Sequence, residues 1–145
     1  MNEIVYDALI KRAQEAGINR YVVGAIIERD SRVLLLERPK DDFMGGIYEF
    51  PSGRVEDGES LDVALCREVE EETGMLFKKI VKYLGHFDYE SKSGKKTRQF
   101  NFAVVVKEFL DVKLSEHKKY AWVNKNQLPQ YHITNSLKEV LSLFW

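Results

Sequence analysis

Short apolar runs of the length and composition of β-strands lie in several parts of the chain. Residues 21–27 and 33–36 are rich in β-branched and aliphatic side chains, and the polar segment 29–32 separates them. Two such runs joined by a short polar turn predict a β-hairpin. The other expected strands are residues 48–50, 79–90, 97–106 and 120–123.

Three further segments carry apolar side chains at helical spacing, and we expect helices at residues 3–16, 60–73 and 135–144. Ser60 can cap the start of the middle helix, and Gly74 can end it. Strands and helices follow one another without strict βαβ alternation, which favours a mixed sheet flanked by helices. The predicted class is therefore α/β in the wider sense that includes α+β.

Composition further restricts the number of domains, the partners and the compartment that we expect. The chain has 145 residues, 44% of them hydrophobic and 31% charged, which predicts a single folded domain over residues 1–145, with residues 1–19 as a helical extension. A net charge of −1 gives no reason to expect membrane binding or a stable nucleic-acid complex. One cysteine, Cys66, and no signal-peptide pattern lead us to expect a cytoplasmic protein.

An acidic face on the middle helix is the first sign of chemistry. Glu68, Glu71 and Glu72 are three or four residues apart, so their side chains share one face. The carboxylates repel one another and lie near the helix C-terminus, where the macrodipole disfavours anions. Arg67 can pair with Glu71, but one cation does not neutralise the group. A hard divalent ion such as Mg²⁺ would, because it prefers oxygen ligands.

A solvated acidic face is the alternative interpretation of this helix. The preceding loop argues against it. Gly53 and Gly58 allow the backbone to approach the same site closely, and Glu59 is placed where a carboxylate suits the helix dipole.

The whole segment 53–75, GRVEDGESLDVALCREVEEETGM, resembles the sequence box of the Nudix hydrolase family, which includes the MutT-like enzymes. That box reads Gly, five residues, Glu, seven residues, Arg-Glu, an apolar residue, any residue, Glu-Glu, any residue, Gly and an apolar residue. All nine specified positions agree. The resemblance implies the family's α/β/α sandwich with a mixed sheet. It also implies hydrolysis of a pyrophosphate bond in a nucleotide-like, small-molecule substrate.

The resemblance also implies roles for individual residues. Glu68, Glu71 and Glu72 would hold Mg²⁺, with Mn²⁺ as an alternative ion, together with the backbone carbonyl of Ser52. The family commonly has glycine where Ser52 stands, but a carbonyl ligand needs no particular side chain. Arg67 would orient a glutamate. Glu59 would either bind metal through water or fix the loop.

A later segment, residues 114–123, resembles the family loop that carries an acidic residue shortly before a Trp-Val strand. Glu116 is therefore a candidate general base or extra metal ligand, and an exposed loop glutamate is the alternative. We expect its neighbour His117 at the surface.

Substrate contacts are expected at Arg38, Gly53, Phe50 and Asn135. Arg38 ends the second strand, where this fold often presents a cation to phosphates, and Gly53 permits close backbone approach. Phe50 can line a base pocket or belong to the core. Asn135 can read a guanine edge, as a similarly placed asparagine does in MutT-like enzymes, or simply cap the last helix.

The leading functional hypothesis is hydrolysis of a (deoxy)nucleoside triphosphate such as 8-oxo-dGTP, giving the monophosphate and pyrophosphate. ADP-ribose, dinucleoside polyphosphate and RNA 5′-end hydrolysis are the alternatives within the family. ADP-ribose enzymes of this family often carry a proline about sixteen residues beyond the box. This sequence has no proline between Pro51 and Pro129, which weighs against that group. A non-catalytic nucleotide-sensing module is an alternative of another class. Monomer and homodimer are both compatible with the sequence.

Overall fold

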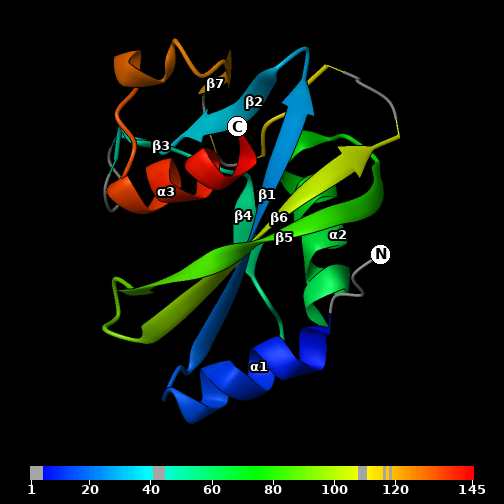
Figure 1. Ribbon diagram of the computed structural model, residues 1–145, viewed down its shortest axis with the longest axis vertical. Coiled ribbons are helices and arrows are strands. Elements are labelled where there is room, and N and C mark those ends of the chain that lie inside the picture. Colours follow the sequence, from blue (N-terminus) through cyan, green and yellow to red (C-terminus); the bar gives the residue numbers. More distant parts are fainter. Residues whose placement is uncertain (1–4, 41–44, 108–110, 116, 118) are drawn as a thin grey trace.

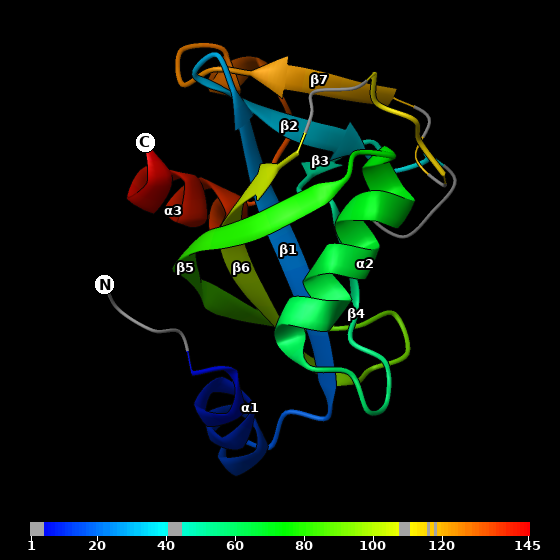
Figure 2. The same cartoon turned by 90° about the vertical axis from the view of Figure 1, so that its right-hand side faces the viewer.

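The computed structural model describes residues 5–40, 45–107, 111–115, 117 and 119–145. A twisted sheet forms the middle of the molecule, with one long helix on one side and the C-terminal helix on the other (Figures 1 and 2). The N-terminal helix lies at one end of the sheet (Figure 2). This arrangement is the predicted helix–sheet–helix sandwich.

The strands pair into one mixed sheet in the order β3-β2-β1-β6-β5, with β4 paired to β1 and β7 paired to β2. Strands β1 and β6 run parallel, and the other pairs are antiparallel. The predicted mixed sheet is thus confirmed. The strands are β1 (Arg20–Arg29), β2 (Arg32–Glu37), β3 (Tyr48–Glu49), β4 (Ser52–Arg54), β5 (Phe77–Glu90), β6 (Lys96–Val106) and β7 (Lys119–Val123).

The helices are α1 (Tyr6–Glu15), α2 (Leu61–Thr73) and α3 (Asn135–Phe144), with a short 3₁₀ turn η1 (Leu128–Gln130). All three predicted helices are present. The first helix was expected to begin at residue 3, and residues 3 and 4 lie outside the described residues. None of the helices in the described ranges is long and apolar enough to span a bilayer.

The β1–β2 hairpin closes as predicted. Asp30 and Ser31 have φ angles of 51° and 63°, so both central residues of the turn adopt the left-handed conformation. Two-residue hairpin turns need this backbone because its twist matches that of the flanking strands, and aspartate tolerates it better than most residues.

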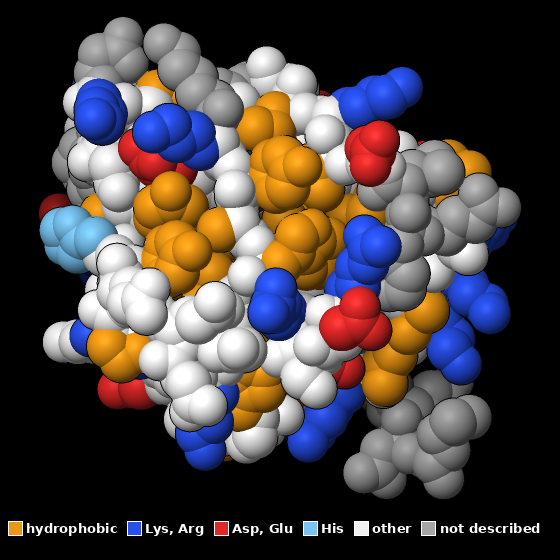
Figure 3. All heavy atoms as spheres, turned by 90° about the horizontal axis from the view of Figure 1, so that it is seen from above, with side chains coloured by type: hydrophobic (Ala, Val, Ile, Leu, Met, Phe, Trp, Pro, Cys, Tyr) orange, Lys and Arg blue, Asp and Glu red, His pale blue; other side chains and the backbone are white. Residues whose placement is uncertain are grey.

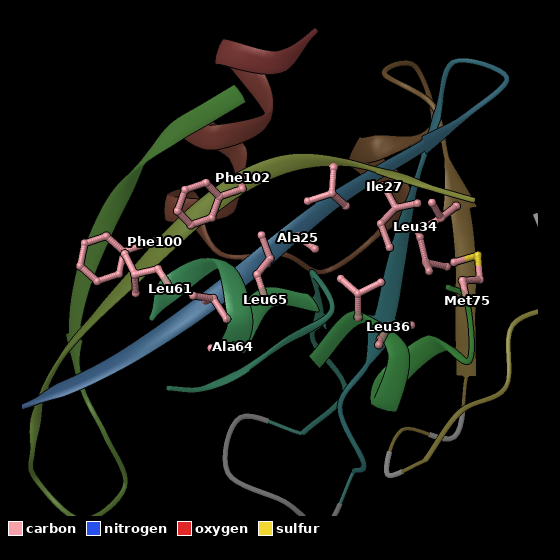
Figure 4. Close-up of a cluster of buried hydrophobic side chains, with 14 of the residues drawn as sticks. Ala25, Ile27, Leu34, Leu36, Leu61, Ala64, Leu65, Met75, Phe100 and Phe102 are labelled. Atoms are coloured by element: carbon pink, nitrogen blue, oxygen red, sulfur yellow. The ribbon is translucent and has the colours of Figure 1, made fainter. Parts of the chain in front are cut away.

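The sheet separates two clusters of buried side chains, one under α2 and the other under α3. In the first, Leu61, Ala64 and Leu65 of α2 point at Ala25, Phe100 and Phe102 of the sheet (Figure 4). Tyr6, Leu9, Ile10 and Ala13 of α1 belong to the same cluster. The second cluster joins Leu137, Val140 and Leu141 of α3 to the opposite face of the sheet. Helix α2 is therefore fixed by its apolar ridge, which leaves its acidic face at the edge of the core.

Strand β4 was not predicted. It is three residues long and contains Gly53, so it lacks the apolar run that marks a strand, yet it pairs with residues 22–24 of β1. This pairing places Ser52 and Gly53 beside α2, and the short strand is thereby part of the candidate site.

The outer surface mixes apolar and charged side chains. Figure 3 shows the end of the molecule where β2 and β7 lie, with hydrophobic side chains gathered in the middle and charges of both signs around them. This mixture agrees with the near-neutral net charge of the chain.

Replacing Leu65 by alanine should lower the free energy of unfolding by about 2–5 kcal/mol, because the side chain is 1% exposed and the cavity left behind would not refill. Val63 is a matched control on the same helix, since it is 53% exposed, and Val63→Ala should change stability by less than about 0.5 kcal/mol. Urea denaturation measures both. Equal effects of the two substitutions would contradict the described orientation of α2.

Candidate active site

Helix α2 carries the carboxylates, and its two ends show how the sequence positions them. Gly74 follows the last helical residue with a φ of 73°, so it ends the helix as predicted. Ser60 occupies the position before the first residue, but its hydroxyl donates to Asp62 Oδ1 at 2.5 Å and accepts no backbone N–H. The predicted location of the cap is confirmed, whereas the predicted capping bond is absent.

Arg67 ties the loop before α2 to the acidic face. Its Nε and Nη2 donate to the two oxygens of Glu59, each at 2.8 Å. Its Nη1 donates to Glu68 Oε1 at 2.7 Å and to Glu71 Oε2 at 3.2 Å. Nη2 also donates to the carbonyl oxygen of Arg54 at 2.9 Å. The predicted i,i+4 pair with Glu71 is present, and it is one part of a larger network.

These contacts and burial shift the pKa values of the carboxyls in opposite directions. The hydrogen bonds from Arg67 and from the Glu56 N–H lower the pKa of Glu59 to about 2. Burial raises the pKa of Glu68 above its ordinary value, and the opposing contacts with Arg67 do not cancel this effect. Of the two roles predicted for Glu59, the structure shows the one that fixes the loop.

Gly53 makes room for Glu68. A methyl group built at Gly53 would coincide with the Glu68 carboxylate, so this position admits no side chain unless the glutamate moves. The absence of a side chain at Gly53 therefore allows the Glu68 carboxylate of α2 to lie directly against the backbone of β4.

The acidic face opens onto a cleft of about 440 Å³. Its lining includes Glu49, Glu68, Glu71, Glu72, Ser52, Gly53 and the arginines Arg20, Arg38 and Arg54. A smaller and more apolar hollow of about 210 Å³ adjoins it, with Tyr48, Phe87, Leu137, Thr134 and Ser136 in its wall. Four residues, Arg38, Glu49, Tyr89 and Gln99, border both spaces.

His117 corrects our expectation of a surface residue. Its side chain is 8% exposed, and Nε2 lies 2.8 Å from Glu49 Oε2. Nδ1 lies 3.0 Å from Glu72 Oε2, a charge contact without hydrogen-bond geometry. Burial lowers the pKa of His117, but its contacts with the two carboxylates outweigh burial and raise the pKa to about 9. Sequence spacing gave no sign of this contact because Glu49 is 68 residues away.

The structure places the remaining predicted site residues in different surroundings. Arg38 lines the cleft as expected and is paired with Glu49 at 3.2 Å. Phe50 is fully buried in the cluster under α3, so it belongs to the core, the second of the two places predicted for it. Glu116 lies outside the described residues.

Asn135 does not cap α3 as predicted, and its contact with a guanine edge stays a prediction. Thr134 caps α3 instead, since its hydroxyl accepts the Leu137 N–H at 3.3 Å. The Asn135 side chain is exposed, and the residue is absent from the lining of both spaces, whereas Thr134 and Ser136 border the apolar hollow. Threonine and asparagine are both good caps, so adjacent candidates could not be separated from the sequence.

The donor set around the cleft fits a hard divalent cation. Carboxylate oxygens are the ligands that Mg²⁺ prefers, and Glu72 Oε2 is buried without a hydrogen-bond partner in the described part of the chain. Among the residues that the structure describes, no three carboxylate, histidine or cysteine groups converge closely enough to hold an ion. Arg67 and His117 hold Glu68 and Glu72 instead, so ion binding requires these side chains to turn toward one another.

Replacing Glu59 by glutamine should lower the melting temperature most at neutral pH. The pKa of Glu59 is depressed, so its stabilising effect is complete above the ordinary value of 4.5 and is lost as pH falls through about 2. The difference in melting temperature between Glu59→Gln and the parent protein should therefore shrink below about pH 4. Glu15→Gln, on the exposed side of α1, is the control for charge alone. A difference independent of pH would contradict the assigned pairing.

Comparison with known proteins adds the family. A family model described as the NUDIX domain matches residues 18–144. The CTP pyrophosphohydrolase of Escherichia coli K12 is 50% identical over 54 residues, which cover 37% of this chain and 40% of that protein. Nucleoside triphosphatase NudI of Escherichia coli O81 is 29% identical over 134 residues, covering 86% of this chain and 95% of the relative.

Among solved structures, the MutT protein from Methanosarcina mazei Go1 superposes with a TM-score of 0.75 at 29% identity, covering 86% of this chain and 91% of that one. The fold, the intact sequence box and the extent of the matched domain agree. This chain belongs to the NUDIX family.

Proposed function

We propose that this protein is a Mg²⁺-dependent hydrolase that cleaves a pyrophosphate bond in a (deoxy)nucleoside triphosphate, such as 8-oxo-dGTP. The observation that carries the proposal is the juxtaposition of two spaces: an acidic cleft beside the box helix, and an apolar hollow that opens next to it. A nucleotide has the same two parts, a charged phosphate chain and a flat, largely apolar base.

The metal would be held by Glu68, Glu71 and Glu72, with the Ser52 carbonyl as a further oxygen ligand. NUDIX proteins generally use divalent ions, and the oxygen donors of this cleft suit Mg²⁺. When bound, the ion neutralises charge on the phosphates and lowers the pKa of coordinated water. Arg67 keeps Glu68 and Glu71 beside the loop, so the chain's own contribution is to hold these two carboxylates at the cleft.

Proton transfer needs a general base, and the candidates are a box glutamate and Glu116. His117 contacts Glu72 and Glu49 together, so it positions both carboxylates in the lining of the cleft. The base itself would have to lie within hydrogen-bond reach of the attacking water.

The base of the nucleotide would occupy the apolar hollow. Tyr48, Phe87 and Leu137 supply apolar contact there, and the rings of Tyr48 and Tyr131 pack in a T-shaped arrangement with centroids 5.0 Å apart. Thr134 and Ser136 place polar groups at the same hollow. The names of two relatives, a CTP pyrophosphohydrolase and a nucleoside triphosphatase, support a triphosphate substrate.

A screen of nucleotides with Mg²⁺, with products separated by chromatography, tests the proposal. We expect a nucleoside monophosphate and pyrophosphate from at least one triphosphate. ADP-ribose, dinucleoside polyphosphates and RNA 5′ ends belong in the same panel because each would give different products. Binding without turnover across the panel would instead favour a nucleotide-sensing role.

Glu72→Gln should keep the fold but lower the turnover rate by about 100-fold or more, because it removes a negative charge from the proposed ligand set. Glu70→Gln is the matched control. It lies on the same helix, is exposed and does not line the cleft. Its carboxylate accepts a hydrogen bond from the Phe77 N–H, with a distance of 3.0 Å between the two atoms. Steady-state kinetics on the best substrate of the screen measures both. Near-normal turnover in Glu72→Gln would remove the assigned role.

A further inference from the structure

Arg20 lines the acidic cleft from strand β1, which lies outside the sequence box. It is the first residue of β1 and pairs with Thr97 of β6, which in turn pairs with Tyr89 of β5. These three residues form one row across the sheet. Arg20 and Tyr89 both line the cleft that contains Glu68 and Glu72.

Arg20 differs in its partners from Arg38, Arg67 and Arg98, whereas Arg54, the remaining arginine of the cleft, is exposed. Arg38 is paired with Glu49, Arg67 with Glu59, and Arg98 with Asp88 at 2.7 Å. The Nε of Arg20 is buried and has no hydrogen-bond partner within the described ranges, and no ion pair of Arg20 is present there either. A buried guanidinium N–H without an acceptor is costly. An acceptor from a ligand would remove this cost.

The position of Arg20 identifies which part of a nucleotide could supply that acceptor. Arg20 lines the acidic cleft but not the apolar hollow, whereas Tyr89 and Gln99 border both. The base would lie in the hollow, so the atoms that reach Arg20 belong to the phosphate chain. A guanidinium presents two parallel N–H groups, which match two oxygens of one phosphate.

We propose that Arg20 binds non-bridging oxygens of the substrate's phosphate chain and is a binding residue outside the box. The inference rests on the function proposed above. It assigns a second anchor to the phosphates: the first is the metal held by α2, and the second is this cation on β1. The charge of Arg20 is balanced by the ligand, because none of the described carboxylates is paired with it.

The test compares Arg20→Gln, Arg20→Lys and the control Lys79→Gln, an exposed lysine of β5 that makes the same change in net charge as Arg20→Gln. Calorimetric titration with deoxyguanosine α,β-imidotriphosphate and Mg²⁺ measures binding without turnover. We expect Arg20→Gln to bind this analogue about 10- to 100-fold more weakly, the scale of a lost hydrogen bond to a charged group. Arg20→Lys should recover only part of the loss, and Lys79→Gln should match the parent.

Phosphate-free deoxyguanosine provides the second measurement. Its affinity should be the same in the parent and in Arg20→Gln, and an equal loss for nucleoside and analogue would overturn the assignment. Unchanged analogue binding in Arg20→Gln would overturn it as well. If Arg20→Gln does not fold, Arg20→Lys decides the question, since parent-like binding by that variant would exclude two-oxygen recognition. Lack of turnover by the parent across the nucleotide panel would reject the proposed function alone. The role of Arg20 would still be tested, because analogue binding is measured without turnover.

Discussion

Repulsion among carboxylates on a single turn of helix is the constraint that the candidate site has to satisfy. Glu68, Glu71 and Glu72 lie together near the C-terminal end of α2, where neither their mutual charge nor the helix dipole favours them. Arg67 offsets part of this cost and also connects the helix to the loop through Glu59 and the Arg54 carbonyl. One guanidinium therefore determines both the charge balance and the course of the chain before α2.

The sheet supplies what the helix cannot. The apolar side of α2 packs on β1 and β6, so the acidic side comes to rest against β4, where Gly53 has no side chain to keep it away. His117 and Glu49 reach the same space from segments far apart in the sequence. The site is thus assembled from the edge of the sheet as well as from the box.

Periodicity and turn chemistry predicted the three helices and the β1–β2 hairpin, because each of these depends on residues close in sequence. The order of the elements along the chain predicted the mixed sheet. Helical spacing likewise predicted the pair of Arg67 with Glu71, whereas the contacts of Arg67 with Glu59 and the Arg54 carbonyl were not predicted. The failures share a different cause. Strand β4 is held by its partner strand and not by its own composition. His117 is buried where it contacts Glu49 and Glu72, which come from distant segments. Such effects appear only once the chain is folded.

The shared border between the two spaces has a consequence for how substrate preference could change. Arg38, Glu49, Tyr89 and Gln99 face the acidic cleft and the apolar hollow at once. A substitution there that admits a different base would also disturb the setting of the reacting phosphates. New preferences on this scaffold should therefore arise more readily from α3 and its preceding turn, where Thr134, Ser136 and Leu137 touch the hollow alone.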